Sequence, residues 1–212
     1  MILLAPLALL AAVAMAGGVG EVWERWWLLP DAQTFLMAAG GGLLLGRLLS
    51  RWLEVLDILS HELTHFVMAL ALLRRPVAIS ATPTGGETVY RGRGSVLIRL
   101  APYFLPLWAL AALALQPLLR SDLRVWGVGA VGLTWGYHLW IMASQIRRHQ
   151  PDLRVDGLIL SVLTVSALSF VTMTLVALAA VGGLDLMGRS LDGSMALLRD
   201  LLDLAYRLAG VV

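Results

Sequence analysis

Apolar stretches long enough to cross a bilayer recur along this chain from one end to the other. Hydrophobic residues make up 59% of its 212 residues and charged residues only 14%, whereas about a quarter of a soluble domain is charged. A segment in lipid must satisfy its backbone hydrogen bonds internally, so stretches of this composition are expected to be α-helices. We therefore predict an all-α polytopic membrane protein that forms a single membrane domain over residues 1–212.

Six transmembrane helices are predicted from the lengths of these stretches. They cover residues 2–19, 32–49, 52–73, 96–119, 125–146 and 157–181. The first two form an N-terminal pair (1–50), and the segment 52–181 forms the core. Residues 21–30 carry three tryptophans among charges, which predicts a connector at the headgroup level. Gly42 and Gly46 are four residues apart, a spacing that predicts close approach of a second helix.

Two segments depart from this helical pattern. Residues 76–95 contain several Gly and Pro residues and then alternate polar with apolar positions, which predicts a short strand-like hairpin that is too polar to span. Residues 184–212 mix Leu and Ala with charged residues. This mixture predicts an amphipathic tail helix that lies on the membrane or on the bundle.

The composition excludes cysteine chemistry and argues against a nucleic-acid partner. The chain has no cysteine, which excludes disulfides, thiolate metal sites and a cysteine nucleophile. A formal charge of +2 argues against nucleic acid as a partner, so the expected surrounding is the lipid bilayer. Arginines are more numerous in the connectors after the first, third and fifth predicted helices, which favours a cytoplasmic position for residues 76–95.

The third predicted helix carries the sequence HELTH, which begins at His61. His61 and His65 are one turn apart, so both imidazoles can reach one zinc ion, while Glu62 is rotated by about 100° and can act as the general base. Ionisable groups within an apolar helix cost about 2.5–3.5 kcal/mol each on insertion scales, so a function is expected to offset that cost. Asp57 is predicted to accept the second ring proton of His61; a solvated helix end is the alternative. The structural alternative is that the two histidines and Glu62 form hydrogen bonds with one another, or pair with arginines, and so hold the helix bundle together.

A catalytic zinc site usually takes three protein ligands, so a third must come from another segment. The candidates are His138, Asp152 and Asp156. His65 and His138 both lie about 13 Å from the ends of their predicted helices at 1.5 Å per residue, which favours His138. Asp152 is the alternative, if its loop folds inward to line a water-filled cavity. Otherwise His138 is a lone histidine hydrogen-bonded between helices.

The sequence SHELTHFVMAL, followed by the Gly-rich loop and LAPYFLP, resembles the site-2 protease family of intramembrane zinc metalloproteases over about residues 52–160. It is most similar to small bacterial members that lack an extra soluble domain. The resemblance implies that His61 and His65 bind Zn²⁺ and that Glu62 is the catalytic base. The family's third ligand is an Asp in an Asp-Gly motif that opens the next core helix. Here the corresponding place holds His138, and Asp156 with its following glycine falls one helix later.

The resemblance also implies an activity. Members of the family hydrolyse peptide bonds of transmembrane proteins, and a strand near the site can pair with the unwound substrate. The matching substrate-binding residues here would be Gly86, Glu87 and Val89, which could add a substrate strand to the hairpin. The expected location is the bacterial cytoplasmic membrane, which the chain would cross several times. The alternative is a non-catalytic membrane scaffold, or a metal-binding carrier or sensor, that retains the HExxH helix; the complete motif argues against it.

Overall fold

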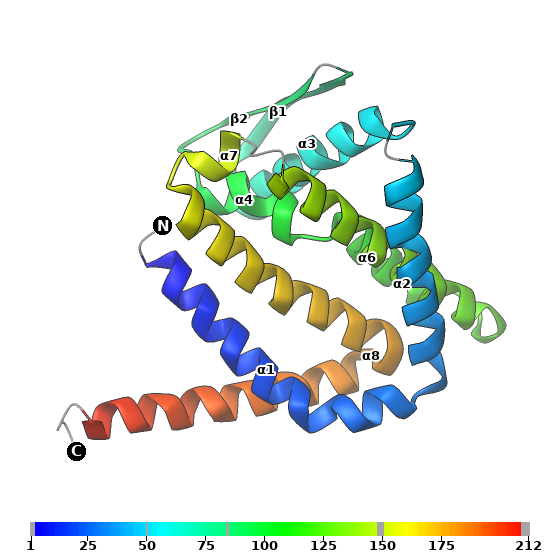
Figure 1. Ribbon diagram of the computed structural model, residues 1–212, viewed down its shortest axis with the longest axis vertical. Coiled ribbons are helices and arrows are strands. Elements are labelled where there is room, and N and C mark those ends of the chain that lie inside the picture. The colour runs from blue at the N-terminus through cyan, green and yellow to red at the C-terminus, as the bar shows by residue number, and fades with distance from the viewer. Residues whose placement is uncertain (1–2, 50, 84, 148–150, 209–212) are drawn as a thin grey trace.

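The computed structural model describes residues 3–49, 51–83, 85–147 and 151–208. Most of this part of the chain is helical, and it contains one two-stranded antiparallel sheet (Figure 1). The helices are α1 (Leu4–Leu28), α2 (Pro30–Leu49), α3 (Glu54–Ala71), α4 (Val96–Phe104), α5 (Leu107–Leu115), α6 (Arg124–Arg147), α7 (Pro151–Arg154) and α8 (Leu158–Leu208). Two 3₁₀ turns, Gln116–Leu118 and Ser121–Leu123, join α5 to α6. A mostly helical protein with a small sheet is thus confirmed.

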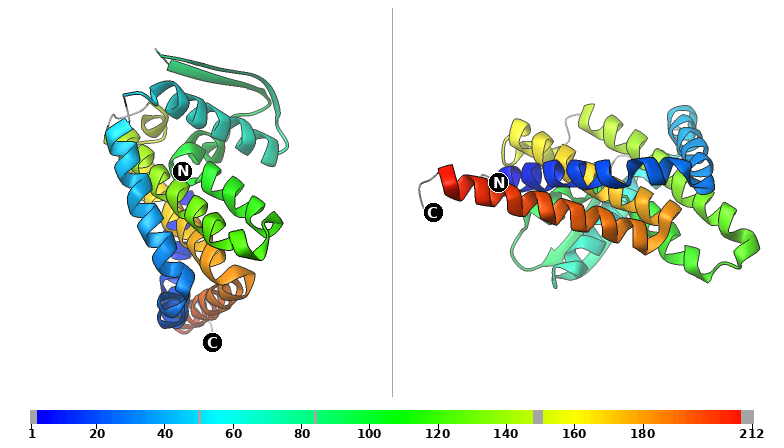
Figure 2. Two further views of the ribbon diagram at one scale, coloured as in Figure 1. Left: turned by 90° about the vertical axis from the view of Figure 1, so that its right-hand side faces the viewer. Right: turned by 90° about the horizontal axis from the view of Figure 1, so that it is seen from below.

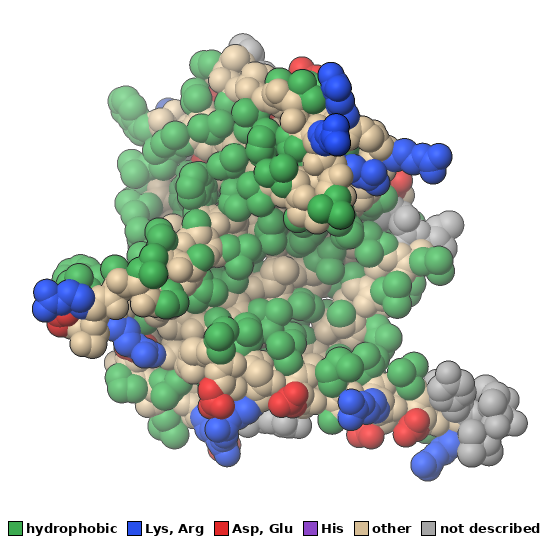
Figure 3. All heavy atoms as spheres, turned by 180° about the vertical axis from the view of Figure 1, so that it is seen from behind, with side chains coloured by type: hydrophobic (Ala, Val, Ile, Leu, Met, Phe, Trp, Pro, Cys, Tyr) green, Lys and Arg blue, Asp and Glu red, His purple; other side chains and the backbone are tan. Residues whose placement is uncertain are grey.

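Two helices are long and apolar enough to cross a bilayer by themselves, Pro30–Leu49 and Leu158–Leu204. Two bent helix pairs, one within α1 and one made of α4 and α5, would raise the number to four among the described residues. Helices α3 and α6 are not in this set, so the six predicted spans are not confirmed. Hydrophobic side chains cover much of the surface in Figure 3, which is expected of a surface that faces lipid.

The segment predicted as a connector, residues 21–30, is mostly helical, because α1 continues to Leu28. No Gly or Pro interrupts this segment after Gly20, and only Leu29, with an extended backbone, separates α1 from Pro30 at the start of α2. Trp26 is buried and packs edge-on against Phe35 of α2. The tryptophans therefore belong to the end of a bent helix that packs on its neighbour.

Helices α2 and α6 pack closely through small residues, as the spacing of Gly42 and Gly46 predicts. A Cβ added at Gly42 would overlap the backbone of Leu133, and one added at Gly46 would lie 2.6 Å from the Trp140 ring. Gly136 of α6 meets α2 in the same way. This contact fixes the position of α6, whose far end reaches the site described below.

The predicted helix over residues 96–119 is broken into α4 and α5, which meet at an angle of 71°. Pro106 causes the break, because proline has no backbone N–H and its ring clashes with the preceding turn. The carbonyl oxygens that this break frees accept hydrogen bonds from α8: Ser169 donates to Tyr103 and Thr172 donates to Phe104. The bend is therefore held by α8.

Helix α8 changes direction at Gly183, whose φ of 69° lies in the left-handed region that favours glycine. The part beyond Gly183 runs beside α1 (Figures 1 and 2). Ser190 and Ser194 are buried there, and a Cβ on Gly18 of α1 would overlap both. The tail thus packs on the bundle, one of the two predicted positions; residues 209–212 lie outside the described residues.

The predicted hairpin is confirmed. Strand β1 (Arg75–Thr82) pairs antiparallel with β2 (Gly85–Arg91), and an irregularity between Pro76 and Ala78 shifts the register. Both strands contact α3, and the hairpin lies along that helix in the left view of Figure 2. This arrangement places one face of the hairpin over the HELTH sequence.

Candidate metal centre

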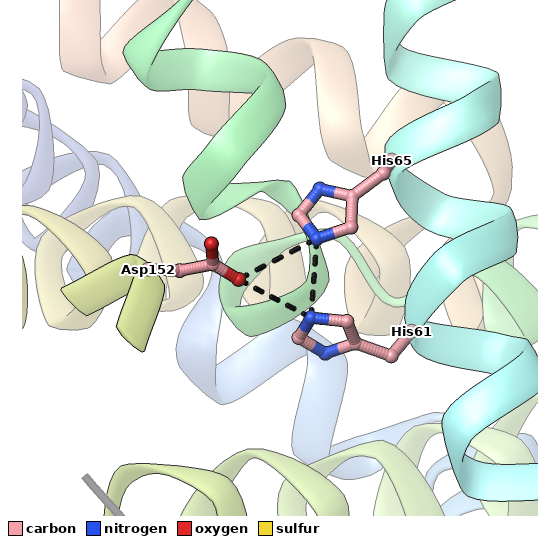
Figure 4. A group of neighbouring side chains, drawn as sticks. All are labelled: His61, His65 and Asp152. Carbon is pink, nitrogen blue, oxygen red and sulfur yellow. Dashed lines mark hydrogen bonds and ion pairs between the residues drawn. The ribbon is translucent and has the colours of Figure 1, made fainter. Parts of the chain in front are cut away.

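Three potential ligand atoms converge between α3 and α7. His61 and His65 lie one turn apart on α3, and their Nε2 atoms are 3.1 Å from each other. The Oδ2 atom of Asp152, on α7, lies 3.4 Å from Nε2 of His61 and 3.5 Å from Nε2 of His65. Figure 4 shows the three side chains pointing at one another. Such a group could hold a metal ion.

The spacing of the three atoms suits a single small cation. Zinc bonds to nitrogen and oxygen of about 2.0–2.1 Å, arranged tetrahedrally, separate any two ligand atoms by about 3.3 Å. The three separations here range from 3.1 to 3.5 Å. Two imidazoles and one carboxylate with a free fourth position are also the composition of many catalytic zinc sites.

Hydrogen bonds on the far side of each ring fix its orientation. Nδ1 of His65 lies 2.7 Å from the carbonyl oxygen of Ile98, and Nδ1 of His61 lies 3.3 Å from Oε1 of Gln145. Both oxygens are acceptors that can hold an Nδ1–H, and the two Nε2 atoms face Asp152 on the opposite side of the rings. Gln145 therefore has the role predicted for Asp57.

Asp152 reaches the site because its helix is anchored to α4. The next residue, Leu153, is completely buried in a cluster with Leu100 and Phe104. Burial alone would raise the pKa of Asp152, but hydrogen bonds with His61 and His65 hold that pKa below its ordinary value. The carboxylate is consequently ionised at neutral pH and available to a cation. Helix α7 lies inward against the site, which meets the condition under which Asp152 was predicted.

The structure does not bring His138 to the two histidines. It lies on α6, where Gln145 contacts His61, and it precedes Gln145 by seven residues, or about 10.5 Å along the helix. Its side chain is buried, and Nε2 has no hydrogen-bond partner in the part of the chain that is described. The sequence favoured His138 because His138 and His65 lie at similar distances from the ends of their helices. That comparison does not include how α3 and α6 pack against each other.

Two other carboxylates in the prediction have partners of their own. Asp57 accepts a hydrogen bond from the Tyr137 hydroxyl, and it lines the same cavity as the histidines. Asp156 forms an ion pair with Arg99 of α4. The geometry thus favours Asp152 over Asp156 as the third ligand.

Strand β2 lies directly against Glu62. The Thr88 hydroxyl is 2.8 Å from both the backbone oxygen and Oε2 of Glu62. A Cβ added at Gly86 would lie 2.5 Å from Cγ of Glu62 and 2.8 Å from Cγ2 of Ile58. Glu62 is 7% exposed, so the strand both covers the carboxylate and holds it.

The face of β2 that meets the site differs from the one predicted. Gly86, Thr88 and Tyr90 line the cavity, while Glu87 and Val89 are exposed and alternate with them on the opposite face. Only Gly86 of the predicted substrate-binding residues therefore faces the site. Thr88 was not predicted, although the two-residue period of a strand, counted from Gly86, indicates it.

The site opens into a cavity of about 650 Å³ between α3, α4, α6, α7 and the hairpin. Its walls include Glu62 and the three potential ligands, together with Arg99 of α4. The volume lies within the range of small-molecule and cofactor sites, about 300–1,000 Å³. A substrate segment could therefore reach the ligand atoms and Glu62 from one cavity.

Replacing Gln145 with Leu is expected to weaken zinc binding by about 10- to 100-fold, the usual effect of losing a partner behind a ligand. His61 would lose the oxygen that orients its ring. Competition with a chromophoric chelator measures the affinity. Gln116→Leu is the matched control, because Gln116 donates to the Ala180 carbonyl away from the site. Equal affinities in the two variants would contradict the role of Gln145.

Replacing Gly86 with Ala is expected to destabilise the protein by about 1–3 kcal/mol, the usual cost of overpacking. The added Cβ would push β2 away from Glu62 and Ile58. Thermal unfolding in detergent measures the change. Gly94→Ala serves as control, since the nearest atom to its Cβ is 3.9 Å away. An unchanged Tm for Gly86→Ala would show that the hairpin does not pack on α3 in this way.

Comparison of this chain with protein-family models, with curated proteins and with solved structures gave no match.

Proposed function

We propose that this chain is an intramembrane zinc metalloprotease that hydrolyses peptide bonds of membrane-embedded proteins or peptides. The observation that carries the proposal is the convergence of His61, His65 and Asp152 at ligand spacing beside Glu62 in one cavity. Imidazole and carboxylate ligands in a site with room for a fourth group suit Zn²⁺. We further propose a multi-pass arrangement in the bacterial cytoplasmic membrane, on the resemblance and the apolar composition.

The residues of the site have separate roles in this reaction. A bound zinc ion would supply Lewis acidity, which polarises a peptide carbonyl and makes a nearby water more acidic. Glu62 accepts the proton of the attacking water and then delivers it to the leaving amine. Thr88 keeps the Glu62 carboxylate against β2 through its contact with Oε2. Positioning a base in this way contributes to the rate because proton transfer requires hydrogen-bond distance.

Access to the site sets a requirement on the substrate. A helical segment hides its carbonyl groups within its own hydrogen bonds, so it must unwind before water can attack. The cavity is bordered by Gly86, where the absence of a side chain leaves the backbone of β2 exposed. An extended substrate could pair with this strand. We therefore propose transmembrane segments with helix-weakening residues as substrates.

Removal and return of the metal tests the proposal. Purified wild-type protein in detergent is expected to contain one zinc per chain by elemental mass spectrometry and to cleave members of a panel of single-span peptides. Treatment with 1,10-phenanthroline should remove both properties, and added Zn²⁺ should restore both. Stoichiometric zinc without cleavage would indicate a carrier or sensor. No zinc, even after it is supplied, would overturn the proposal in favour of a scaffold.

A further inference from the structure

Four arginines surround the end of the hairpin where β1 begins and β2 ends. They are Arg74, Arg75, Arg91 and Arg93, here called the hairpin-base arginines. Arg75 lies directly opposite Arg91 in the sheet register. The Arg74 side chain lies over Gly92, with Cδ 3.1 Å from where a glycine Cβ would stand. Three of the four arginines, all except Arg74, are exposed.

This arrangement is unfavourable for the protein by itself. Like charges directly opposite each other on paired strands repel. None of the hairpin-base arginines forms an ion pair within the described residues. Nε of Arg74 is buried and has no hydrogen-bond partner there either. The positive charge is consequently balanced by no carboxylate of the described chain, and an anion from outside would relieve the repulsion.

The surroundings of the arginines are apolar. Leu73 immediately precedes them and is 91% exposed, and Leu70 and Val77 are each more than half exposed. Leu73 also has a φ of 56°, in the left-handed region that leucine rarely adopts. The turn therefore presents a leucine beside the cations. Basic residues next to exposed aliphatic ones match the boundary between lipid headgroups and acyl chains, whereas a free phosphate would need no apolar neighbour.

We propose that the hairpin-base arginines bind the headgroups of anionic phospholipids. Figure 3 shows arginine side chains gathered at the end of the molecule that carries the hairpin, beside hydrophobic ones. Helix α2 also ends at this end of the molecule (Figure 1) and carries Arg47 in its last turn. Clusters of arginine next to membrane helices favour the cytoplasmic leaflet, where anionic lipids are held by such clusters.

Lipid bound here would act on the site through β2. The strand ends at Arg91 and carries Thr88 and Gly86 against Glu62. Anchoring one end of the hairpin to headgroups would hold this face on α3. The lipid site itself does not depend on the metal; only this consequence rests on the proposed function.

The test compares two double variants with equal loss of charge. Arg75→Gln/Arg91→Gln removes the opposed pair, and Arg120→Gln/Arg199→Gln removes two exposed arginines elsewhere. Each protein, in a neutral detergent, is titrated with dioleoyl-phosphatidylglycerol, with dioleoyl-phosphatidylcholine or with inorganic phosphate. Thermal unfolding reports stabilisation, and native mass spectrometry identifies the bound lipid.

Phosphatidylglycerol is expected to stabilise the wild type and the control variant, and phosphatidylcholine is not. At about 1 kcal/mol for each arginine near an anionic surface, Arg75→Gln/Arg91→Gln should bind phosphatidylglycerol about thirtyfold more weakly. Without anionic lipid this variant should unfold at the same temperature as the wild type or higher, because the repulsion is gone. Equal responses of all three proteins would overturn the proposal. So would stabilisation by inorganic phosphate alone, which would identify a phosphate site.

Discussion

Replacing Glu62 with Gln is expected to lower the rate of peptide hydrolysis by about 10²- to 10⁴-fold, the usual contribution of a general base. Gln has the size of Glu and can keep the contact with the Thr88 hydroxyl, but its amide cannot accept the proton of an attacking water. The measurement is the initial rate of cleavage of any single-span peptide that the wild type cleaves, with zinc content determined on the same samples.

The zinc content separates this role from a structural one. The three converging ligand atoms belong to His61, His65 and Asp152. Because Glu62 supplies none of them, Glu62→Gln should retain one zinc per chain. Glu87→Gln is the matched control, because Glu87 lies on the opposite, exposed face of β2 and should leave the rate unchanged. Cleavage by Glu62→Gln at the wild-type rate would refute the proposed chemistry, whatever the metal content.

The part of the site that the sequence predicts is the part that one helix determines. His61, Glu62 and His65 lie within a single turn and a half, so helical periodicity alone sets which side chains share a face. The structure adds what lies on other elements. Thr88 comes from a strand, and Gln145 comes from α6. Their contacts depend on how the hairpin and α6 pack on α3, and no local pattern contains that information.

The third candidate ligand shows the same limit more sharply. Asp152 lies in a short polar segment between two apolar helices, and composition places such a segment at the surface. The residue that decides otherwise is Leu153, which is buried in the cluster under α4. A single apolar residue next to a carboxylate in a polar loop is a weak signal in a sequence. It becomes meaningful only when the partner surface on α4 is known.

The helix boundaries were predictable where proline or glycine sets them. The hairpin was predictable from its glycines and alternation, and the end of the core helix lies near Gly183, as its composition suggests. The predictions differed from the structure where composition alone was used to decide whether a helix continues. Pro106 breaks a stretch that reads as one span, and the charged, tryptophan-rich segment before Leu29 continues a helix. Composition reports the affinity of a segment for lipid, whereas backbone chemistry decides where a helix bends.

Replacing Asp152 with Ala is expected to weaken zinc binding by more than about 100-fold. Loss of a partner behind a ligand already costs 10- to 100-fold, and Asp152 would be a ligand itself and the only one with a negative charge. His138→Ala should leave the zinc content of the purified protein unchanged. Elemental mass spectrometry of wild type, Asp152→Ala, His138→Ala and His61→Ala, all prepared identically, measures the difference.

The opposite result would have a specific structural meaning. If His138→Ala lost the metal and Asp152→Ala kept it, His138 would have to lie where Gln145 now contacts His61. That exchange requires α6 to be displaced along its axis by seven residues, or about 10.5 Å. Such a displacement would separate Gly42 and Gly46 from their contacts with α6. Close packing of α2 on α6 and ligation by His138 therefore exclude each other, so the metal content of these variants also tests the arrangement of the helices.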